Sequence, residues 1–228
     1  DFDIWKDRLT VFYLDLKHIP AVEAFTDYLM EILPSLEILI NNAAQTIRKP
    51  QEFYVHLEKR EEAALSLPQQ KLLGSWKCVY EKELVRLPTA KKGINLPITS
   101  EMFPEGKLDR HGEPVDLRAK NSWNSTLSEV STLEMLEAQI VNATAPFILN
   151  SRLKPLFLKS LFPKRFIINV SAMEGQFSRK NKTHFHPHTN MAKASLNMMT
   201  RTAGIDYAKD NIFMNSVDTG WVTQEHPY

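Results

Sequence analysis

Arg165-Phe-Ile-Ile-Asn-Val-Ser171 is the stretch of this sequence that decides the fold. Most of it is apolar and rich in β-branched side chains, which predicts a buried strand, and a small polar residue follows at once. Three other stretches have the same character, at residues 10–15, 36–41 and 212–217. Strands with apolar side chains on both faces are typical of parallel sheets, because the crossover connections cover such sheets with helices.

Apolar side chains at helical spacing separate these predicted strands. They occupy residues 20–33, 131–158 and 191–209. The alternation predicts an α/β fold: a Rossmann-like, three-layer, doubly wound and mostly parallel sheet with helices on both faces. Residues 50–120 interrupt the pattern with many prolines and glycines, and we interpret them as a long insertion over one end of the sheet. Residues 1–228 then form a single domain.

Composition excludes several classes of protein. The 28 Lys and Arg residues nearly balance the 27 Asp and Glu residues, so binding to nucleic acid through phosphate contacts is not expected. Cys78 is the single cysteine, which excludes a disulfide framework and a multi-cysteine zinc site. No apolar run has the roughly 18 residues that a membrane span needs, and no secretory signal opens the sequence. We therefore expect a soluble, intracellular protein of the cytoplasm without membrane partners.

Polar or small residues follow each predicted strand. They are Asp15, Asn41, Ser171 and the run Asp218-Thr-Gly220. Parallel strands of an open sheet end at the same edge, and ligands bind in the crevice beyond that edge. The sequence therefore predicts a binding site that gathers these four positions.

Five short motifs in this order resemble those of the short-chain dehydrogenase/reductase family. They are Asn41-Asn-Ala-Ala44, Val141-Asn142, Asn169-Val-Ser-Ala172, Lys193 near the start of a helix, and Thr219-Gly-Trp-Val-Thr223. Each motif alone is a weak signal, but five in register are a strong one. The resemblance implies an oxidoreductase that uses NAD or NADP to transfer a hydride to or from a small carbonyl or alcohol substrate. A homo-oligomer is possible.

The resemblance also assigns residues to the cofactor. Asp15, followed by Leu16, would accept a hydrogen bond from the adenine amino group; otherwise Asp15 caps the helix that contains Pro20. Asn41 and Ala43 would let the backbone approach a ribose, or they form an ordinary turn after the strand. The remaining positions, which would hold the nicotinamide end, are Lys193, Thr219, Gly220, Trp221, Val222 and Thr223. Packing in a core or lid is the simpler role for Trp221.

Asn142 lies within a predicted helix, four residues before Pro146. Proline has no N–H, so the carbonyl of Asn142 loses its usual helical partner and is free to bind another group. In the family, this carbonyl holds a water in a proton relay towards the active-site lysine. The alternative is an ordinary proline kink.

The proton-transfer positions depart from the family pattern. Thr189 stands where a tyrosine is expected four residues before Lys193, and Ala172 stands where a serine is expected, with Ser171 one residue early. An aliphatic hydroxyl cannot replace a tyrosine whose pKa a neighbouring cation has lowered. We expect His186 or His188 to handle the proton, because imidazole titrates near neutral pH. The alternative is a non-catalytic member that keeps the fold as a binding or interaction module.

The segment before Thr189 carries further polar side chains. In an extended chain the rings of His184, His186 and His188 would share one side, as a metal site requires, but a solvated loop is the simpler interpretation and no metal is expected. Arg179, Lys180 and Lys182 could accept an anionic substrate. We favour a solvated loop for these as well.

The glycine-rich turn that receives the cofactor's pyrophosphate in this family is absent from the sequence. If the resemblance holds, the strands at residues 10–15 and 36–41 are the third and fourth of the family's sheet. The first and second strands, which lie between them in that sheet, are then missing from the sequence. Such a gap would leave two unpaired strand edges inside a sheet. We therefore expect these residues to be part of a longer chain, truncated at its N-terminus, unless the two strands pair directly.

Overall fold

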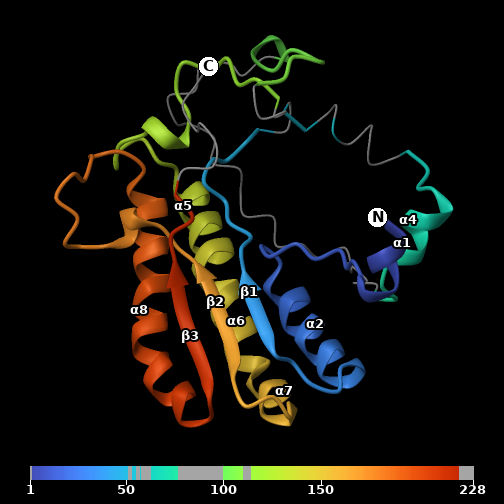
Figure 1. The fold of residues 1–228 in the computed structure, drawn as a ribbon. Helices are drawn as coiled ribbons and strands as arrows, with labels where there is room; N and C mark the ends of the chain where they lie inside the picture. Colours follow the sequence, from blue (N-terminus) through green and yellow to red (C-terminus); the bar gives the residue numbers. More distant parts are fainter. Residues whose placement is uncertain are drawn as a thin grey trace.

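The computed structural model describes residues 2–50, 53–54, 57, 63–76, 100–109 and 114–220. A parallel sheet and several packed helices form its centre (Figure 1). The helices are α1 (Phe2–Trp5), α2 (Ile19–Ile32), α4 (Leu67–Leu72), α5 (Thr132–Gln139), α6 (Ala145–Arg152), α7 (Lys154–Lys159) and α8 (Pro187–Lys209). The short 3-10 turns are Lys6–Arg8, Ser100–Met102, Ser122–Asn124 and Met173–Gly175.

The described sheet has three parallel strands in the order β1 (Ile38–Asn41), β2 (Arg165–Val170) and β3 (Ile212–Val217). This confirms the predicted strands at residues 36–41, 165–170 and 212–217 and the Rossmann-like α/β class. The register aligns Asn41 with Asn169 and Asn169 with Ser216, so a row of polar side chains crosses the sheet near its carboxyl edge.

The helices that pack on the sheet gather on one of its faces. On that face Ile167 and Ile212 lie in the core with Phe157 of α7. Asn169 lies on the same face of the sheet, and its Nδ2 donates to Oγ1 of Thr200 in α8 over 2.9 Å. Helix α2 packs beside α6, and α5 packs beside α8. The helices therefore form one continuous layer on this face.

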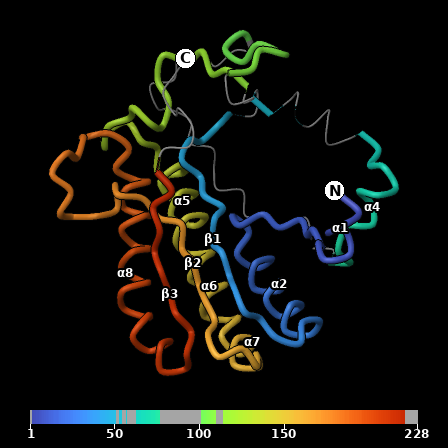
Figure 2. The backbone as a smooth tube through the Cα atoms, in the orientation of Figure 1, coloured from blue at the N-terminus to red at the C-terminus, as the bar shows by residue number. Residues whose placement is uncertain are grey.

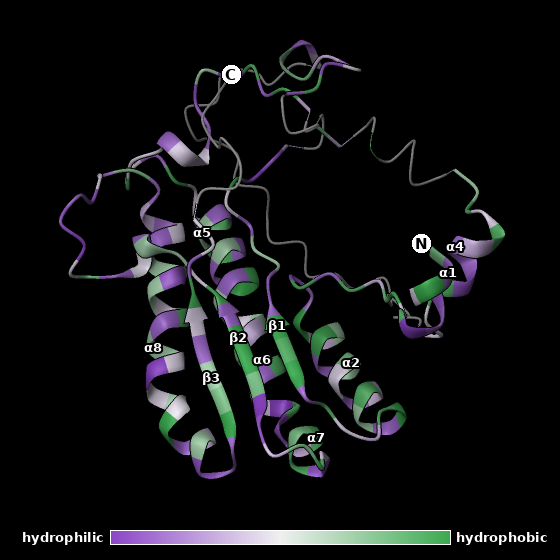
Figure 3. Ribbon diagram, viewed as in Figure 1, coloured by the Kyte–Doolittle hydropathy of each residue, from purple (hydrophilic) through white to green (hydrophobic). Residues whose placement is uncertain are grey.

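The opposite face of the sheet is apolar and partly exposed. Ile38 and Ile40 of β1 are 55% and 58% exposed, and Phe166 and Ile168 of β2 are half-buried. Figure 3 shows this apolar character along the strands. No helix within the described residues covers this face, so the second helical layer expected from the sequence is not seen in that part of the chain.

The predicted strand at residues 10–15 is wrong. The segment contributes only an isolated bridge from Val11 to Leu73, just after α4, and the side chain of Tyr13 is exposed. It does not pair with β1, whose outer edge has no partner strand among the described residues. Figure 2 shows the chain near α1 and α4 lying away from the sheet. The expectation of a longer chain stays a prediction.

The predicted helix at residues 131–158 is interrupted. Between α5 and α6 the backbone forms a π-turn, Ile140–Thr144, in which the N–H of Ala145 bonds to the carbonyl of Ile140. Pro146 follows directly and offers no N–H to the carbonyl four residues before it. The widened turn is the local response to that missing bond, and such turns often mark functional sites.

The predicted insertion is only partly described. Residues 100–109 and 114–120 lie beyond the carboxyl ends of the strands, as expected (Figure 1), whereas α4 lies to one side of the sheet. Across the described ranges, no helix is both long enough and apolar enough to cross a bilayer.

Candidate active site

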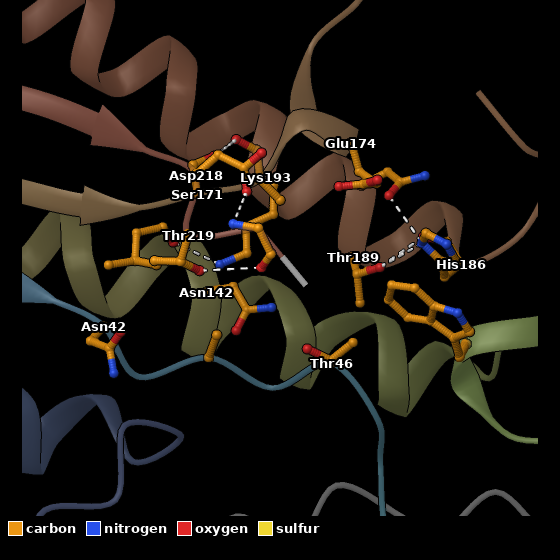
Figure 4. A pocket seen from close by; sticks show the side chains of 16 residues that line it. Asn42, Thr46, Asn142, Ser171, Glu174, His186, Thr189, Lys193, Asp218 and Thr219 are labelled. Atoms are coloured by element: carbon orange, nitrogen blue, oxygen red, sulfur yellow. Dashed lines mark hydrogen bonds between the residues drawn. The ribbon is translucent and has the colours of Figure 1, made fainter. Parts of the chain in front are cut away.

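A cavity of about 240 Å³ opens at the carboxyl ends of the strands (Figure 4). Its walls come from the turns after β1, β2 and β3, the π-turn, the 3-10 turn Ser122–Asn124 and the first turns of α8. The structure thus brings distant segments of the sequence to one place. The expected site residues that line the cavity are Asn142, Ser171, His186, Thr189, Lys193, Thr219 and Gly220.

Lys193 lies in the cavity wall, in the second turn of α8. Its Nζ donates to the backbone carbonyl of Val170 at the end of β2, over 2.8 Å. Burial lowers the pKa of its ammonium group. The ammonium group of Lys193 is therefore partly desolvated, and the backbone at the end of β2 holds it in the cavity wall.

Ser171 is buried beside Lys193. Its N–H donates to the carbonyl of Val217 over 2.8 Å, and its Oγ donates to the backbone carbonyl of Lys193 over 3.3 Å. Ser171 therefore ties the end of β2 to both β3 and α8. Ala172, at the family's serine position, also lines the cavity and has no hydroxyl.

The Asn142 side chain forms two hydrogen bonds with the backbone of Gln45 in the loop after β1, and we call this pair of bonds the clamp. Its Oδ1 accepts from the N–H of Gln45 over 2.6 Å, and its Nδ2 donates to the carbonyl of Gln45 over 2.8 Å. Both ends of the amide are thereby used within the protein. The backbone role expected for Asn142 stays a prediction, and the side chain gains a structural role that the sequence did not indicate.

His186 forms the opposite wall of the cavity. It precedes α8 in a left-handed conformation, with φ at 40°, and its ring stacks on Trp123 at a centroid distance of 4.2 Å. Its Nδ1 lies 3.1 Å from Oδ1 of Asn190 and 3.3 Å from Oγ1 of Thr189. Burial lowers the pKa of His186 and outweighs the raising effect of the bond to Asn190. The ring is therefore held in place, and burial favours its neutral form.

His188 points away from the cavity. It is 2% exposed, and its Nε2 lies 3.6 Å from Oε1 of Glu134 in α5, while its Nδ1 has no hydrogen-bond partner within the part of the chain that the structure describes. Burial raises the pKa of Glu134, but hydrogen bonds from His188 and Ser122 outweigh this effect and leave it lowered. Of the two histidines expected to handle a proton, the structure brings only His186 to the cavity.

The three histidines do not lie in one extended segment, which a shared side for their rings would require. His184 is exposed on the loop, His186 precedes the helix, and His188 lies within its first turn. Helical geometry replaces the extended chain that would have aligned their rings. The described residues contain no group of three or more side chains suited to a metal ion.

Several expected cofactor positions lie elsewhere. Asp15 accepts from the N–H of Lys17 over 2.9 Å and does not line the cavity. It does not cap α2 either, because Nδ1 of His18 accepts the N–H of Ala21 at that helix end. Leu16 does not line the cavity. Ala43 is exposed and outside its wall.

Asn41 lies beneath the cavity and not in it. Its Nδ2 donates to Oδ1 of Asn150 and to Oδ1 of Asn169, each over 2.8 Å. These bonds join β1, α6 and β2 below the site. Trp221, Val222 and Thr223 lie outside the described residues.

Gly220 marks the wall after β3. Its φ is 71°, a conformation that strongly favours glycine, and a Cβ at this position would meet nothing within 4 Å. Its N–H donates to Oδ1 of Asp218 over 3.0 Å. The turn thus presents open backbone surface to the cavity.

Sequence reasoning missed four lining residues. They are Thr46, Trp123, Glu174 and Asn190. Trp123 lies just after a proline- and glycine-rich segment with no periodic pattern, so nothing in the sequence connected it with His186. Asn190 could have been noticed, because it lies four residues after His186 and shares one face of the helix start with it.

Both the sequence and the fold of this chain resemble those of known proteins. Residues 118–226 match the family model described as Enoyl-(Acyl carrier protein) reductase. The fold matches the NADPH-bound carbonyl reductase from chicken fatty liver with a TM-score of 0.55 and 17% identity, over 96% of this chain and 61% of that one. Residues 118–226 are therefore similar to that reductase family, and the fold is the Rossmann-like fold of short-chain dehydrogenases/reductases.

Two further proteins are similar to this chain. A putative short-chain dehydrogenase/reductase from Burkholderia multivorans with bound NADP matches with a TM-score of 0.55 and 17% identity, over 98% of this chain and 62% of that one. The uncharacterized protein R665 of Acanthamoeba polyphaga mimivirus is 30% identical over 206 residues, which are 88% of this chain and 40% of that protein. The chain thus spans less than two thirds of each of these proteins.

Proposed function

We propose that the protein is an NAD(P)-dependent oxidoreductase that transfers a hydride between nicotinamide and a carbonyl or alcohol substrate, with an altered proton donor. The observation that carries this proposal is the cavity that both Lys193 and His186 line. The match of residues 118–226 to the reductase family model supports it, and so do proteins of the same fold whose structures contain NADP or NADPH.

The cavity suits one end of such a cofactor. Its 240 Å³ is below the roughly 300–1,000 Å³ of pockets that enclose a whole ligand, so it would receive the nicotinamide and its ribose. Lys193 offers an ammonium to ribose hydroxyls, and the open backbone at Gly220 permits close approach. Asp15 and Leu16 would meet the adenine end outside this cavity, and that role is part of the proposal.

When bound, nicotinamide supplies or accepts the hydride. In its protonated form, His186 would give the Nε2 proton to the substrate oxygen, because its Nδ1 faces Asn190 and Thr189; the neutral ring would take a proton from an alcohol at the same nitrogen. Thr189 holds the ring, since its Oγ1 also donates to the carbonyl of His186 over 2.9 Å. Thr189 and Ser171 therefore position groups and do not donate the proton. The backbone carbonyl of Asn142 would hold a relay water.

A second candidate function is a binding or interaction module without catalysis. The specific observation that favours it is the loss of both family hydroxyls, with Ala172 in the cavity wall and Thr189 turned to His186. Fold alone does not decide between the two.

A fluorescence titration of the full-length protein with NADH and NADPH, followed by turnover measurements on a panel of aldehydes and ketones, tests the proposal. We expect saturable enhancement of nicotinamide fluorescence and reduction of at least one carbonyl compound. Binding without turnover of any carbonyl would favour the second candidate. Absence of binding by both nucleotides would end the oxidoreductase proposal.

A further inference from the structure

A second cavity, of about 340 Å³, adjoins the first. The two share four lining residues, Trp123, Glu174, His186 and Asn190, so the stacked rings of Trp123 and His186 form part of the wall between them. The two cavities therefore meet at these residues, and a molecule with its reacting carbon beside His186 would extend towards the second cavity.

The second cavity is rich in hydrogen-bond donors. Arg179, Asn181, Lys182 and Thr183 line it from the loop before α8. Glu174 is the one carboxylate among its lining residues, and Arg179 already forms an ion pair with it. Lys182 donates to the backbone carbonyl of Glu174, and no carboxylate within the described residues forms an ion pair with it. The lining therefore carries two cations and one anion.

Two contacts hold the loop that carries these donors, while Asn181, Lys182 and Thr183 are themselves exposed. The side chain of Arg179 is only 28% exposed because of its ion pair with Glu174. The end of the loop is fixed where the N–H of His186 donates to the carbonyl of Ser125 over 2.8 Å. Donors held over a cavity without matching acceptors favour an incoming group made of anionic oxygens.

We propose that the second cavity is a substrate subsite for an anionic oxygen group, a carboxylate or a phosphate. The proposal rests on the proposed function and narrows its substrate class. The substrate is a carbonyl or alcohol compound that bears an anionic group away from the reacting carbon. Lys182 contributes the free charge, and Asn181 and Thr183 supply neutral donors.

Binding of simple probes tests the subsite without any turnover. Benzoate, phenyl phosphate and the neutral benzamide are titrated into the full-length protein while tryptophan fluorescence is followed, with Trp123→Phe identifying the reporter. We expect at least one anion to bind about tenfold more tightly than benzamide, the factor that ~1.4 kcal/mol gives. The better of the two anions identifies the natural group. Equal binding of all three probes, including no binding of any, would overturn the proposal.

Two variants of the same loop make the test specific. Lys182→Gln removes the free charge inside the cavity, and Lys180→Gln removes an exposed charge that does not line it. We expect the preference for the anion to be lost in Lys182→Gln and kept in Lys180→Gln. An equal loss in both variants would mean that overall charge attracts the probe, which would contradict a subsite.

A turnover comparison separates this proposal from the function it rests on. The kcat/KM for 4-carboxybenzaldehyde is compared with that for benzaldehyde, and we expect the charged aldehyde to be favoured about tenfold. If NADPH binds and both aldehydes react equally, the subsite is wrong while the proposed function stands. If NADPH does not bind but the anion preference persists, the proposed function fails and the anion site remains.

Discussion

The two walls of the first cavity are held in different ways. On one wall, Asn142, Ser171 and Lys193 each place a side-chain atom against the backbone of a neighbouring segment. On the other wall, His186 and Trp123 meet by ring stacking, and the imidazole is held by side chains of its own helix start.

This difference separates positions that carry the fold from positions that carry the chemistry. The backbone-tied wall joins the ends of regular elements, so its residues are coupled to the stability of the sheet edge. The stacked wall is assembled from a turn and a helix start, so its residues can change with little cost to the core. Each wall contains one departure from the family pattern: Ala172 follows Ser171 on the backbone-tied wall, and Thr189 contacts His186 on the stacked wall.

The largest expected effect is on catalysis, from His186→Asn. Asparagine tolerates the left-handed backbone at this position but cannot transfer a proton as imidazole does. We expect kcat for carbonyl reduction to fall by about 10²–10⁴-fold, the usual contribution of a general acid. The free energy of unfolding should change little. His184→Asn, on the exposed loop, is the matched control and should keep full activity.

The pH dependence of this reaction follows from the same residue. Burial holds the pKa of His186 below its usual value near 6.5, so the protonated ring forms only as the pH falls towards that lowered pKa. Carbonyl reduction should therefore speed up at acidic pH, whereas alcohol oxidation, which needs the neutral ring, should slow down there. Both pH dependences should disappear in His186→Asn. Unchanged pH dependences in that variant would assign the proton to another group.

Lys193→Met tests the backbone-tied wall. It should weaken cofactor binding and raise the free energy of unfolding. Loss of a charged hydrogen-bond donor should weaken NADPH binding by about 10–100-fold in a fluorescence titration. Because burial lowers the pKa of Lys193, its charge is less stable in the folded state than in water, and its removal should raise the free energy of unfolding by about 0.5–2 kcal/mol. Lys209→Met, exposed at the end of α8, should change neither quantity.

The alkaline pH dependence of stability checks the sign of that effect. A lysine whose folded-state pKa lies below its unfolded value binds fewer protons when folded, so it makes stability rise with pH between those two values. Urea denaturation across that range should show this contribution as a difference between the wild-type protein and Lys193→Met. A difference of the opposite sign would contradict a burial-lowered pKa.

Asn142→Ala should cost stability more than chemistry. It leaves the N–H and the carbonyl of Gln45 without their partner, which should lower the free energy of unfolding by about 1–3 kcal/mol. Asn215→Ala, at an exposed position in β3, should change it by less than about 0.5 kcal/mol. Equal losses in urea denaturation would show that the clamp contributes nothing special.

The smallest effect is expected from Trp123→Phe. Phenylalanine keeps an aromatic face against His186, and the stacking of such rings contributes about 0.5–1.5 kcal/mol in total. We expect kcat/KM to fall by less than about tenfold in Trp123→Phe and by more in Trp123→Ala. A larger loss from Phe than from Ala would mean that the stack does not orient the imidazole.

The sequence predicted the strands correctly where an apolar segment also has a neighbouring strand to pair with. The bounds expected for β2 and β3 match the structure because both strands continue a paired sheet. Residues 10–15 have the same composition but find no partner strand among the described residues, so composition alone misled there. The break before Pro146 was visible as a lost hydrogen bond, although its form, a π-turn, was not.

The candidate site was predictable only where a motif fixed the spacing. Lys193 and Asn142 were located in this way, and both line the cavity. Sequence could not choose between His186 and His188, because the choice depends on where α8 begins. The stack on Trp123 depends on a turn from a different segment, which no local pattern encodes.

A deuterium-transfer experiment tests the central claim most directly. The full-length protein is given NADPH carrying deuterium at the transferable C4 position together with a carbonyl substrate, and the alcohol product is examined by mass spectrometry. We predict one deuterium per product molecule, on the former carbonyl carbon, in the wild-type protein and in the residual turnover of His186→Asn. A product without deuterium, or no product from any carbonyl compound when NADPH is bound, would contradict the account.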